Sequence, residues 1–414
     1  MEINVQSEIG KLNGVIVHTP GDEIENMTPE NAERALYSDI LNLAVASREY
    51  SQFINVLKLQ TQVFEVKDLL KTVLDNKEAR KSLLNRIYLN ENAEYLREQF
   101  DDYDSTLLSD LLIQGVPLKR NTLTKYFSKE RYSLQPLHNF FFTRDASATI
   151  NQSVLISTMR SLVRRRESLI MEAIFSHHPE LKTKTIGLNK NKFPNHNVSF
   201  EGGDILIAGK DILVIGNGLR TSTQGIDFII DQLKKEKTTK HIIVQQLPET
   251  PESFIHLDMV FTLLDKNSCM IYAPVILTKN IYKTVHLTIT DGEVKNISEE
   301  ENIISALGKL GLELNPIYCG GSKDEWVQER EQWHSGANFF AIAPGKVMGY
   351  QRNVHTIDEM NNKGYEIITA EDVIAGKEDP DDYKKVAITI AGAELSRGGG
   401  GCRCMTMPIN RDTL

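Results

Sequence analysis

The segment Phe200-Glu-Gly-Gly-Asp-Ile-Leu-Ile-Ala-Gly-Lys-Asp-Ile-Leu-Val-Ile215 decides the class of fold. Two apolar runs, Asp204–Ala208 and Asp211–Ile215, flank Gly209-Lys210, a pattern that predicts two antiparallel strands joined by a tight turn. A pattern typical of a helix follows, from about Thr223 to Lys235. The segment therefore predicts a hairpin followed by a helix within an α/β fold.

The same order recurs further along the chain. Phe340–Ala343 and Val347–Tyr350 flank Pro344-Gly-Lys346 and predict a second hairpin, and Val386–Ile390 predicts another strand. No clean sequence repeat accompanies these elements. Hairpins that alternate with helices argue against a plain doubly wound parallel sheet.

The N-terminal third has a different pattern of residues. Residues 14–18 and 62–66 have strand character, and apolar residues recur at helical spacing from Ala32 to about Leu59. Residues 67–135 contain one glycine, one proline, dense charges and leucines every three or four positions. We interpret residues 67–135 as a helical insertion within one catalytic domain that spans residues 1–414.

Composition narrows the functional classes. The 414 residues are 41% hydrophobic and 25% charged, with a net charge of −9, so a nucleic acid or an anionic membrane is not the expected partner. No apolar run approaches the roughly 20 residues that cross a bilayer, and no export signal is evident. Four cysteines in this length do not form a disulfide scaffold. We expect a cytoplasmic enzyme that acts on a small molecule and forms a homo-oligomer.

The segment Ser396-Arg-Gly-Gly-Gly-Gly-Cys-Arg-Cys-Met-Thr-Met-Pro408 is the most unusual in the chain. Its glycines allow positive φ and close approach to a ligand. Arg397 and Arg403 lie where positive charge would favour a thiolate. Locally, Cys402 and Cys404 are equal candidates for a nucleophile, and a flexible tail with an incidental thiol is the alternative. A structural zinc site needs more ligands than this segment supplies.

Three other segments carry groups suited to chemistry. Phe141–Asp145 ends an aromatic run in a carboxylate, and Phe200–Asp204 separates two acids by two glycines. In Phe254–Phe261, strand alternation predicts that His256 and Asp258 share one face. Each segment alone is ambiguous, because a single histidine on a strand is more often structural than catalytic.

Together these groups suit a guanidinium substrate. Carboxylates bind the N–H donors of a guanidinium in bidentate fashion, a thiolate attacks its central carbon, and a histidine protonates the departing nitrogen. One cysteine, one histidine and several acids are sufficient for this reaction. We therefore expect no metal and no cofactor.

The ordered motifs of the chain resemble those of the bacterial arginine deiminases, members of the pentein superfamily, over essentially the full length. The resemblance rests on Ser7–Leu12, His18–Gly21, Phe142–Asp145, Arg164–Glu167, Glu201–Asp204, His256–Asp258, Glu329–Trp333 and Cys404–Pro408. It implies a five-bladed α/β propeller with a helical insertion. It also implies hydrolysis of L-arginine to L-citrulline and ammonia through a covalent thiouronium intermediate.

The resemblance also implies residue roles. It makes Cys404 the nucleophile and His256 the general acid and base, and it resolves the choice against Cys402. Carboxylates would hold the guanidinium, and other side chains would bind the substrate α-carboxylate or line the slot beside it. The implied carboxylates are Asp145, Glu201 and Asp258, and the other substrate-binding residues are Arg164, Arg220, Asn139 and Phe142.

One departure bears on substrate choice. Many family members carry an arginine five residues before the nucleophile, where this chain has Gly399. Agmatine, another guanidino compound, or transfer of the amidino group to an amine are therefore alternatives. A guanidine-binding protein without turnover is a further alternative. The clustered acids also predict that the Cys404 thiol ionises only when the cationic substrate is bound.

Overall fold

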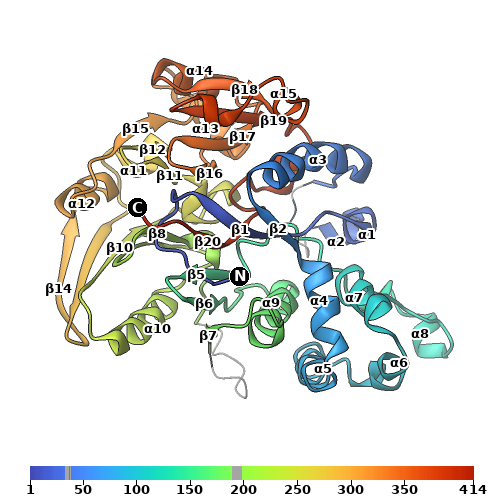
Figure 1. Ribbon diagram of the computed structural model, residues 1–414. Coiled ribbons are helices and arrows are strands. Elements are labelled where there is room, and N and C mark those ends of the chain that lie inside the picture. Colours follow the sequence, from blue (N-terminus) through green and yellow to red (C-terminus); the bar gives the residue numbers. More distant parts are fainter. Residues whose placement is uncertain (33–36, 38, 189–197) are drawn as a thin grey trace.

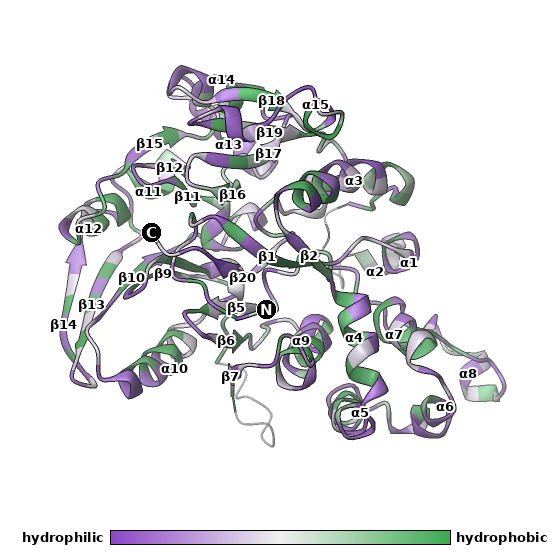
Figure 2. Cartoon of the chain, in the orientation of Figure 1, coloured by the Kyte–Doolittle hydropathy of each residue, from purple (hydrophilic) through white to green (hydrophobic). Residues whose placement is uncertain are grey.

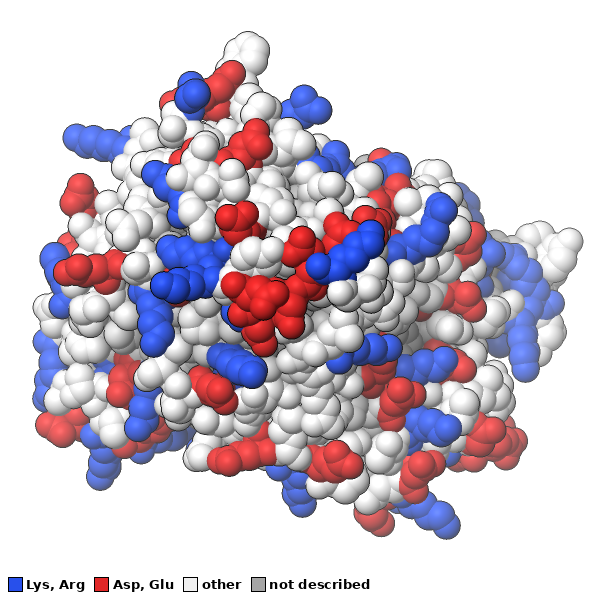
Figure 3. Space-filling model, turned by 45° about the horizontal axis from the view of Figure 1, so that its top comes forward, with Lys and Arg blue, Asp and Glu red and all other residues white. Residues whose placement is uncertain are grey.

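The computed structural model describes residues 1–32, 37, 39–188 and 198–414. Among these residues, no helix combines the length and apolar character that a membrane crossing requires. Lysine, arginine and acidic side chains are interspersed over the face in Figure 3. The predicted α/β fold with hairpins is confirmed.

Five sheets of the described chain are built on one plan, in which an antiparallel pair of strands is extended by a parallel strand, and in four of them the antiparallel pair is a hairpin. In the sheet that contains the opening segment, β8 (Ile205–Gly209) and β9 (Ile212–Asn217) form the hairpin, and β10 (Lys240–Gln246) pairs parallel with β9. Helix α10 (Thr223–Leu233) connects β9 to β10. A second hairpin, β13 (Thr284–Thr290) and β14 (Glu293–Glu300), widens this sheet.

Three further sheets repeat the plan and the intervening helix. Their members are β5 (Ser147–Ile150), β6 (Ser153–Ile156), α9 (Arg165–His177) and β7 (Lys184–Ile186); β11 (Phe261–Asp265), β12 (Ser268–Ile271), α12 (Ile303–Lys309) and β15 (Asn315–Tyr318); and β16 (Phe340–Ala343), β17 (Lys346–Tyr350), α14 (Val354–Asn362), β18 (Glu366–Thr369) and β19 (Val386–Ile390). The repeat is structural, because each unit must bury one face of a short hairpin under one helix, and many apolar sequences satisfy that need.

The two ends of the described chain complete the fifth sheet. Strand β20 (Met407–Arg411) pairs antiparallel with β1 (Leu12–Val17), and β2 (Gln62–Glu65) pairs parallel with β1 after α3 (Leu43–Gln60). Figure 1 shows β1 and β20 in the middle of the view, with the other sheets placed around them. The pairing of β1 with β20 brings residues from both ends of the sequence together. The five-bladed α/β propeller stays a prediction.

The helix expected from Ala32 to about Leu59 is only partly correct. Helix α3 begins at Leu43, where the side chain of Asn42 accepts a hydrogen bond from the Val45 N–H and caps the helix. A short helix, α2 (Pro29–Ala32), precedes it. Residues 33–36 and 38 of the expected helix lie outside the described residues.

Residues 67–135 are mainly helical. They include most of α4 (Val66–Asp75), together with α5 (Lys77–Glu91), α6 (Arg97–Asp101), α7 (Ser105–Gln114) and α8 (Leu123–Tyr126). A short strand pair, β3 (Val116–Pro117) and β4 (Tyr132–Leu134), was not expected. That this block is an insertion in a single domain stays a prediction.

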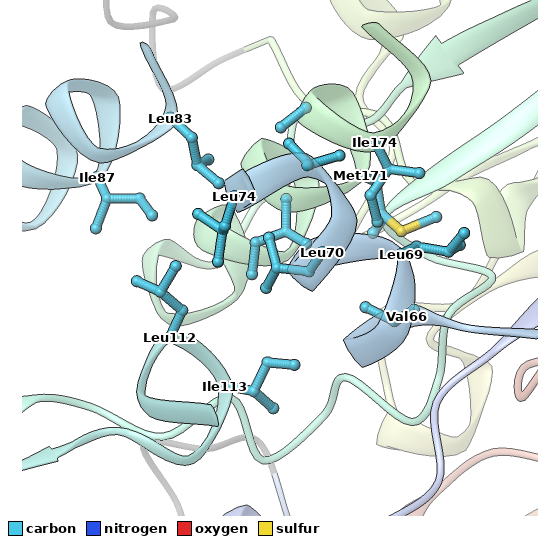
Figure 4. Close-up of a cluster of buried hydrophobic side chains, with 14 of the residues drawn as sticks. Val66, Leu69, Leu70, Leu74, Leu83, Ile87, Leu112, Ile113, Met171 and Ile174 are labelled. Carbon is cyan, nitrogen blue, oxygen red and sulfur yellow. The ribbon is translucent and has the colours of Figure 1, made fainter. Parts of the chain in front are cut away.

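The helices of this block pack on α9 through an apolar core. Leu69, Leu70 and Leu74 of α4 lie between leucines of α5 and α7 and the side chains of Met171 and Ile174 (Figure 4). Figure 2 shows that hydrophobic residues of these helices alternate with hydrophilic ones. Burial of such stripes is the main source of stability for helices of this length.

Candidate active site

A cavity of about 530 Å³ collects most of the residues that the sequence pointed to. It is lined by Asn139, Phe142, Asp145, Arg164, Arg220, His256 and Cys404, among others. Glu201 and Asp258 are fully buried behind the lining residues. Glu201 contacts His256, and Asp258 contacts Cys404. The nine predicted residues, which the sequence spreads over more than 260 positions, therefore form one site.

His256 lies between two carboxylates. Its Nε2 is 2.9 Å from Glu201 Oε2, and its Nδ1 is 3.6 Å from Asp145 Oδ1. Burial lowers the pKa of His256, but Asp145 and the hydrogen bond to Glu201 outweigh it and raise that pKa to about 9. The imidazole is therefore protonated at neutral pH.

The two glycines of Glu201–Asp204 make room for this histidine. A Cβ on Gly203 would lie 2.6 Å from the His256 ring, and a Cβ on Gly202 would lie 2.1 Å from the Arg144 carbonyl oxygen. The Asp204 carboxylate then accepts a hydrogen bond of 2.9 Å from the Leu257 N–H. The glycine pair is required by close packing against the site.

The expectation that His256 and Asp258 lie on one strand is wrong. His256 is extended, but it caps a 3₁₀ turn over Leu257–Met259, and the strand β11 begins only at Phe261. The hydrogen bond from the Leu257 N–H to Asp204 holds this turn in place. The turn directs both side chains to the site, which strand alternation would also have done.

Cys404 is held by a carboxylate and an amide. Its Sγ lies 3.6 Å from Asp258 Oδ2 and 3.2 Å from the Nδ2 of Asn338. Burial raises the pKa of the Cys404 thiol well above its usual range, and the charges of Asp258 and Asp145 raise it further. The direction of this shift favours the protonated thiol, and ionisation only on substrate binding stays a prediction.

The arginines beside the glycine run do not counteract these acids in the way the sequence suggested. Arg403 lowers the Cys404 pKa, but its effect is smaller than that of burial and the carboxylates. Its guanidinium is engaged with Asp258 Oδ2 at 2.7 Å and with Glu8 at 3.0 Å. Arg397 is half-exposed and pairs with Asp39 and Glu394.

The geometry separates the two rival cysteines. Both cysteines belong to the apolar cluster that includes Phe141 and Tyr350, but only Cys404 lines the cavity, whereas Cys402 is fully buried. Within the glycine run, only Gly399 has a positive φ, of 82°. A Cβ on Gly400 would lie 2.5 Å from the Phe142 ring, so this glycine serves close packing.

The two arginines predicted for the substrate carboxylate are both paired with acids. Arg164 donates from Nη1 to Asp145 Oδ2 at 2.7 Å and forms a bidentate pair with Glu167. Nη1 of Arg220 is 3.9 Å from Glu201 Oε1. Burial raises the Glu201 pKa, but Arg220 and the hydrogen bond to His256 outweigh it and lower that pKa to about 2.

Sequence reasoning missed three residues of the site. Glu8 and Glu167 sit inside motifs already recognised, Ser7–Leu12 and Arg164–Glu167, and their pairing with arginines could have been suspected. Asn338 carries no such signal, because an asparagine after a helix is usually a turn residue.

One group of donors in the described residues has the spacing of a metal site. Ligand atoms of Asp145, Glu201 and His256 lie within 4.8 Å of one another, and all three residues are buried. The same acids also suit an organic cation, because a guanidinium binds through N–H donors to carboxylates.

Comparison with known proteins places the chain in a family. The family model for arginine deiminase matches residues 33–411. The chain is 32% identical over 430 residues to the arginine deiminase of Listeria monocytogenes HCC23, covering 100% of this chain and 98% of that protein. It is 33% identical over 439 residues to the arginine deiminase of Treponema denticola, with coverage of 100% and 99%.

The fold has solved counterparts at lower identity. An amidinotransferase of saxitoxin biosynthesis from Microseira wollei superposes with a TM-score of 0.55 at 13% identity, covering 100% of this chain and 98% of that one. At this identity the likeness concerns the fold alone. The family model and the full-length relatives show that this chain belongs to the arginine deiminase family.

Proposed function

We propose that Cys404 is the nucleophile with which this chain hydrolyses L-arginine to L-citrulline and ammonia. The observation that carries the proposal is the cavity that contains the Cys404 thiol, the protonated His256 and the Asp145 carboxylate together. A cationic, planar substrate is the ligand that such a set of groups recognises, because it satisfies the carboxylates and supplies an electrophilic carbon.

The guanidinium of L-arginine binds between the carboxylates of Asp145 and Asp258, and Glu201 orients it. Asp145 is already paired with a guanidinium in the structure, that of Arg164 at 2.7 Å. The α-carboxylate is bound by Arg164 and Arg220 with help from Asn139, and Phe142 lines the slot. Substrate entry therefore replaces the ion pair of Arg164 with Asp145 by two others. The substrate guanidinium pairs with Asp145, and the substrate α-carboxylate pairs with Arg164.

The substrate cation also activates the nucleophile. Burial and the carboxylates raise the pKa of the Cys404 thiol, and a positive charge placed among those carboxylates lowers it. The thiol proton leaves to solvent as the cation enters. The resulting thiolate attacks the central guanidinium carbon and forms the C–S bond of a tetrahedral intermediate.

His256 then acts twice. It donates its proton to the departing nitrogen, so the C–N bond breaks, ammonia leaves and a thiouronium remains on Cys404. The neutral imidazole removes a proton from water, and the hydroxide attacks the same carbon. The C–S bond then breaks and expels the thiolate, and the proton of the new hydroxyl group leaves to solvent, which gives the citrulline ureido group. Because the pKa of His256 in the free protein is about 9, we expect kcat/KM to fall above about pH 9.

The decisive test compares two neighbouring cysteines. Purified wild type and Cys402→Ala are expected to release equal citrulline and ammonia from L-arginine, whereas Cys404→Ala is expected to release none. Intact-protein mass spectrometry of an acid-quenched reaction should show the thiouronium adduct, mapped to the peptide that contains Cys404. Undiminished turnover by Cys404→Ala, or an adduct elsewhere, contradicts the assignment.

Thiol reactivity tests substrate-assisted ionisation. We expect iodoacetamide to alkylate Cys404 slowly at pH 7 in the free enzyme and faster as the pH rises. Rapid inactivation at pH 7 without substrate contradicts this step.

We also infer a cytoplasmic location and self-association. All four cysteines are buried and unpaired, which suits a reducing compartment. Light scattering of the purified protein tests for a homo-oligomer, and fractionation of the source cells tests the location.

A further inference from the structure

Asn338 lies directly against the nucleophile and belongs to no motif that the sequence reveals. It is 1% exposed and sits between α13 (Glu325–Trp333) and β16. Its Nδ2 is 3.2 Å from Cys404 Sγ and 3.1 Å from the Asp258 carbonyl oxygen. The side chain therefore connects the nucleophile to the turn that carries Asp258.

The orientation of the Asn338 amide is fixed by its other end. Oδ1 accepts hydrogen bonds from the backbone N–H groups of Arg403 at 2.9 Å and Cys404 at 3.1 Å. Only an oxygen can accept two N–H donors, so the NH₂ group must face the sulfur. The flipped orientation of the amide, in which Oδ1 would face the sulfur of Cys404, is therefore excluded.

The glycine run provides the space for this amide. A Cβ on Gly401 would lie 2.7 Å from both Asn338 Cβ and Asn338 Oδ1. Contacts below 3.0 Å force one of the groups to move. Gly401 therefore serves the close approach of Asn338 to the backbone of the nucleophile.

We propose that Asn338 is a further catalytic residue, whose Nδ2–H donates to Cys404 Sγ and stabilises negative charge on that sulfur. This inference rests on the proposed role of Cys404. The sulfur carries negative charge twice in the reaction, before it attacks the guanidinium carbon and when it is expelled in the last step. A preorganised donor in a buried site stabilises both states without reorganisation.

Asn338 is a neutral donor among charged groups. Asp258 and Asp145 disfavour the thiolate, and Arg403 favours it weakly because its guanidinium is shared with acids. The imidazolium of His256 faces the same cavity. A neutral amide stabilises the thiolate without attracting the substrate carboxylate or repelling the substrate cation.

Asn338→Asp tests the proposal with little change in shape. One carboxylate oxygen still accepts from the Arg403 and Cys404 N–H groups, while the other replaces the donor and faces the sulfur. We expect the midpoint of the pH profile for alkylation of Cys404 to rise by about one unit or more. We also expect kcat to fall by about 10²-fold, as on loss of an oxyanion donor, with a much smaller change in KM.

Asn353→Asp is the matched control. Asn353 is 2% exposed, its Nδ2 donates to the His334 carbonyl oxygen at 3.0 Å, and it does not contact Cys404. It reports the general effect of a buried carboxylate nearby. The proposal is overturned if the alkylation midpoint of Asn338→Asp equals that of wild type. It is also overturned if Asn338→Asp loses no more kcat than Asn353→Asp does.

Gly401→Ala is a second route if Asn338→Asp does not fold. The added methyl group displaces the Asn338 amide but retains its chemistry, so the same rise in the alkylation midpoint is expected. An unchanged midpoint in folded Gly401→Ala overturns the proposal.

Failure of the inference and failure of the proposed function are distinguishable. Alkylation reports on the sulfur without turnover, whereas citrulline release by Cys404→Ala reports on the role of the nucleophile. If Cys404→Ala is inactive and the midpoint of Asn338→Asp is unchanged, only the role of Asn338 is wrong.

Discussion

Two buried clusters beside the cavity have the same composition, an arginine between a glutamate and an aspartate. Arg403 donates from Nη1 to Asp258 at 2.7 Å and forms a bidentate pair with Glu8. Arg164 donates from Nη1 to Asp145 at 2.7 Å and forms a bidentate pair with Glu167. The two clusters are the Glu8–Arg403–Asp258 cluster and the Glu167–Arg164–Asp145 cluster.

The surroundings of the two clusters shift the pKa values of their glutamates in opposite directions. Burial raises the Glu8 pKa, but Arg403 and Arg144 outweigh it and lower that pKa to about 2. Burial raises the Glu167 pKa to about 7, because Arg164 lowers it less than burial and the other carboxylates raise it. Glu8 of the first cluster is therefore ionised at neutral pH, whereas Glu167 of the second cluster titrates near neutral pH and pairs with an arginine that lines the cavity.

The comparison teaches that identical residue types can be structural in one place and exchangeable in another. The Glu8–Arg403–Asp258 cluster fixes a carboxylate beside Cys404, and its arginine does not line the cavity. In the Glu167–Arg164–Asp145 cluster, the arginine lines the cavity. Under the proposed function, the substrate guanidinium meets an arginine on each carboxylate, Arg403 on Asp258 and Arg164 on Asp145, but only Arg164 is placed to bind the substrate α-carboxylate in exchange.

Loss of the central arginine should give the largest difference in stability between the two clusters. Arg403→Met leaves Glu8 and Asp258 buried without their partner, which costs about 3–5 kcal/mol in the free energy of unfolding. Arg164→Met should cost about half as much, because Glu167 takes up a proton near neutral pH. Urea unfolding at pH 7 measures both, and equal losses contradict the comparison.

The two glutamates should give opposite pH dependence of stability. The stabilisation from ionised Glu8 is complete above its ordinary pKa of 4.5 and is lost as the pH falls towards about 2. Folded Glu167 holds its proton up to about pH 7, so its contribution to stability decreases as the pH rises from 4.5 to about 7. Each shift corresponds to about 3 kcal/mol.

Two substitutions isolate these contributions. Relative to wild type, Glu167→Gln should gain stability between pH 4.5 and 7, whereas Glu8→Gln should lose stability at neutral pH and recover its deficit below pH 4.5. Thermal unfolding over this pH range measures the differences. If the stability of the two variants changes with pH in the same direction relative to wild type, the comparison is contradicted.

Substrate selectivity should depend on the second cluster. Arg164→Met removes a partner of the α-carboxylate, so we expect kcat/KM for L-arginine to fall about 10–100-fold more than kcat/KM for agmatine, which lacks that carboxylate. Steady-state kinetics with both substrates check this. An equal loss for both substrates indicates that Arg164 does not bind the carboxylate.

Gly399→Arg should give the smallest change. A Cβ at Gly399 meets nothing within 4 Å, and the residue lines the cavity, so an arginine there adds a cation near the substrate carboxylate. We expect a several-fold increase in preference for L-arginine over agmatine. Because φ is 82°, stability should fall by about 1 kcal/mol. No change in preference contradicts a role for this position.

Much of the fold was predictable from local pattern. The hairpin at residues 204–215 combines two apolar runs with a glycine turn, and such short-range signals do not depend on the rest of the chain. The turn at Leu257–Met259 was not predictable, because it is held by a hydrogen bond to Asp204, a residue distant in sequence. Tertiary hydrogen bonds of this kind override local strand propensity.

The same distinction applies to the candidate site. Cys404, His256 and the carboxylates could be named because unusual residue types recur in ordered motifs. The pairing of Arg164 with Asp145 and the position of Asn338 could not, since both depend on how separate sheets pack around the centre. The high pKa of Cys404 follows from burial, which the local sequence does not reveal.

The pairing of β20 with β1 has a consequence for biosynthesis. Glu8 and Arg403 are 395 residues apart in sequence, and β1 leaves the ribosome that much earlier than its partner strand. At about 5–20 residues per second, one edge of β1 stays bare for roughly 20–80 s. A bare edge strand is a template for association with other chains. That edge of β1 therefore finds its native partner only after Cys404 and the β20 strand that follows it have been translated.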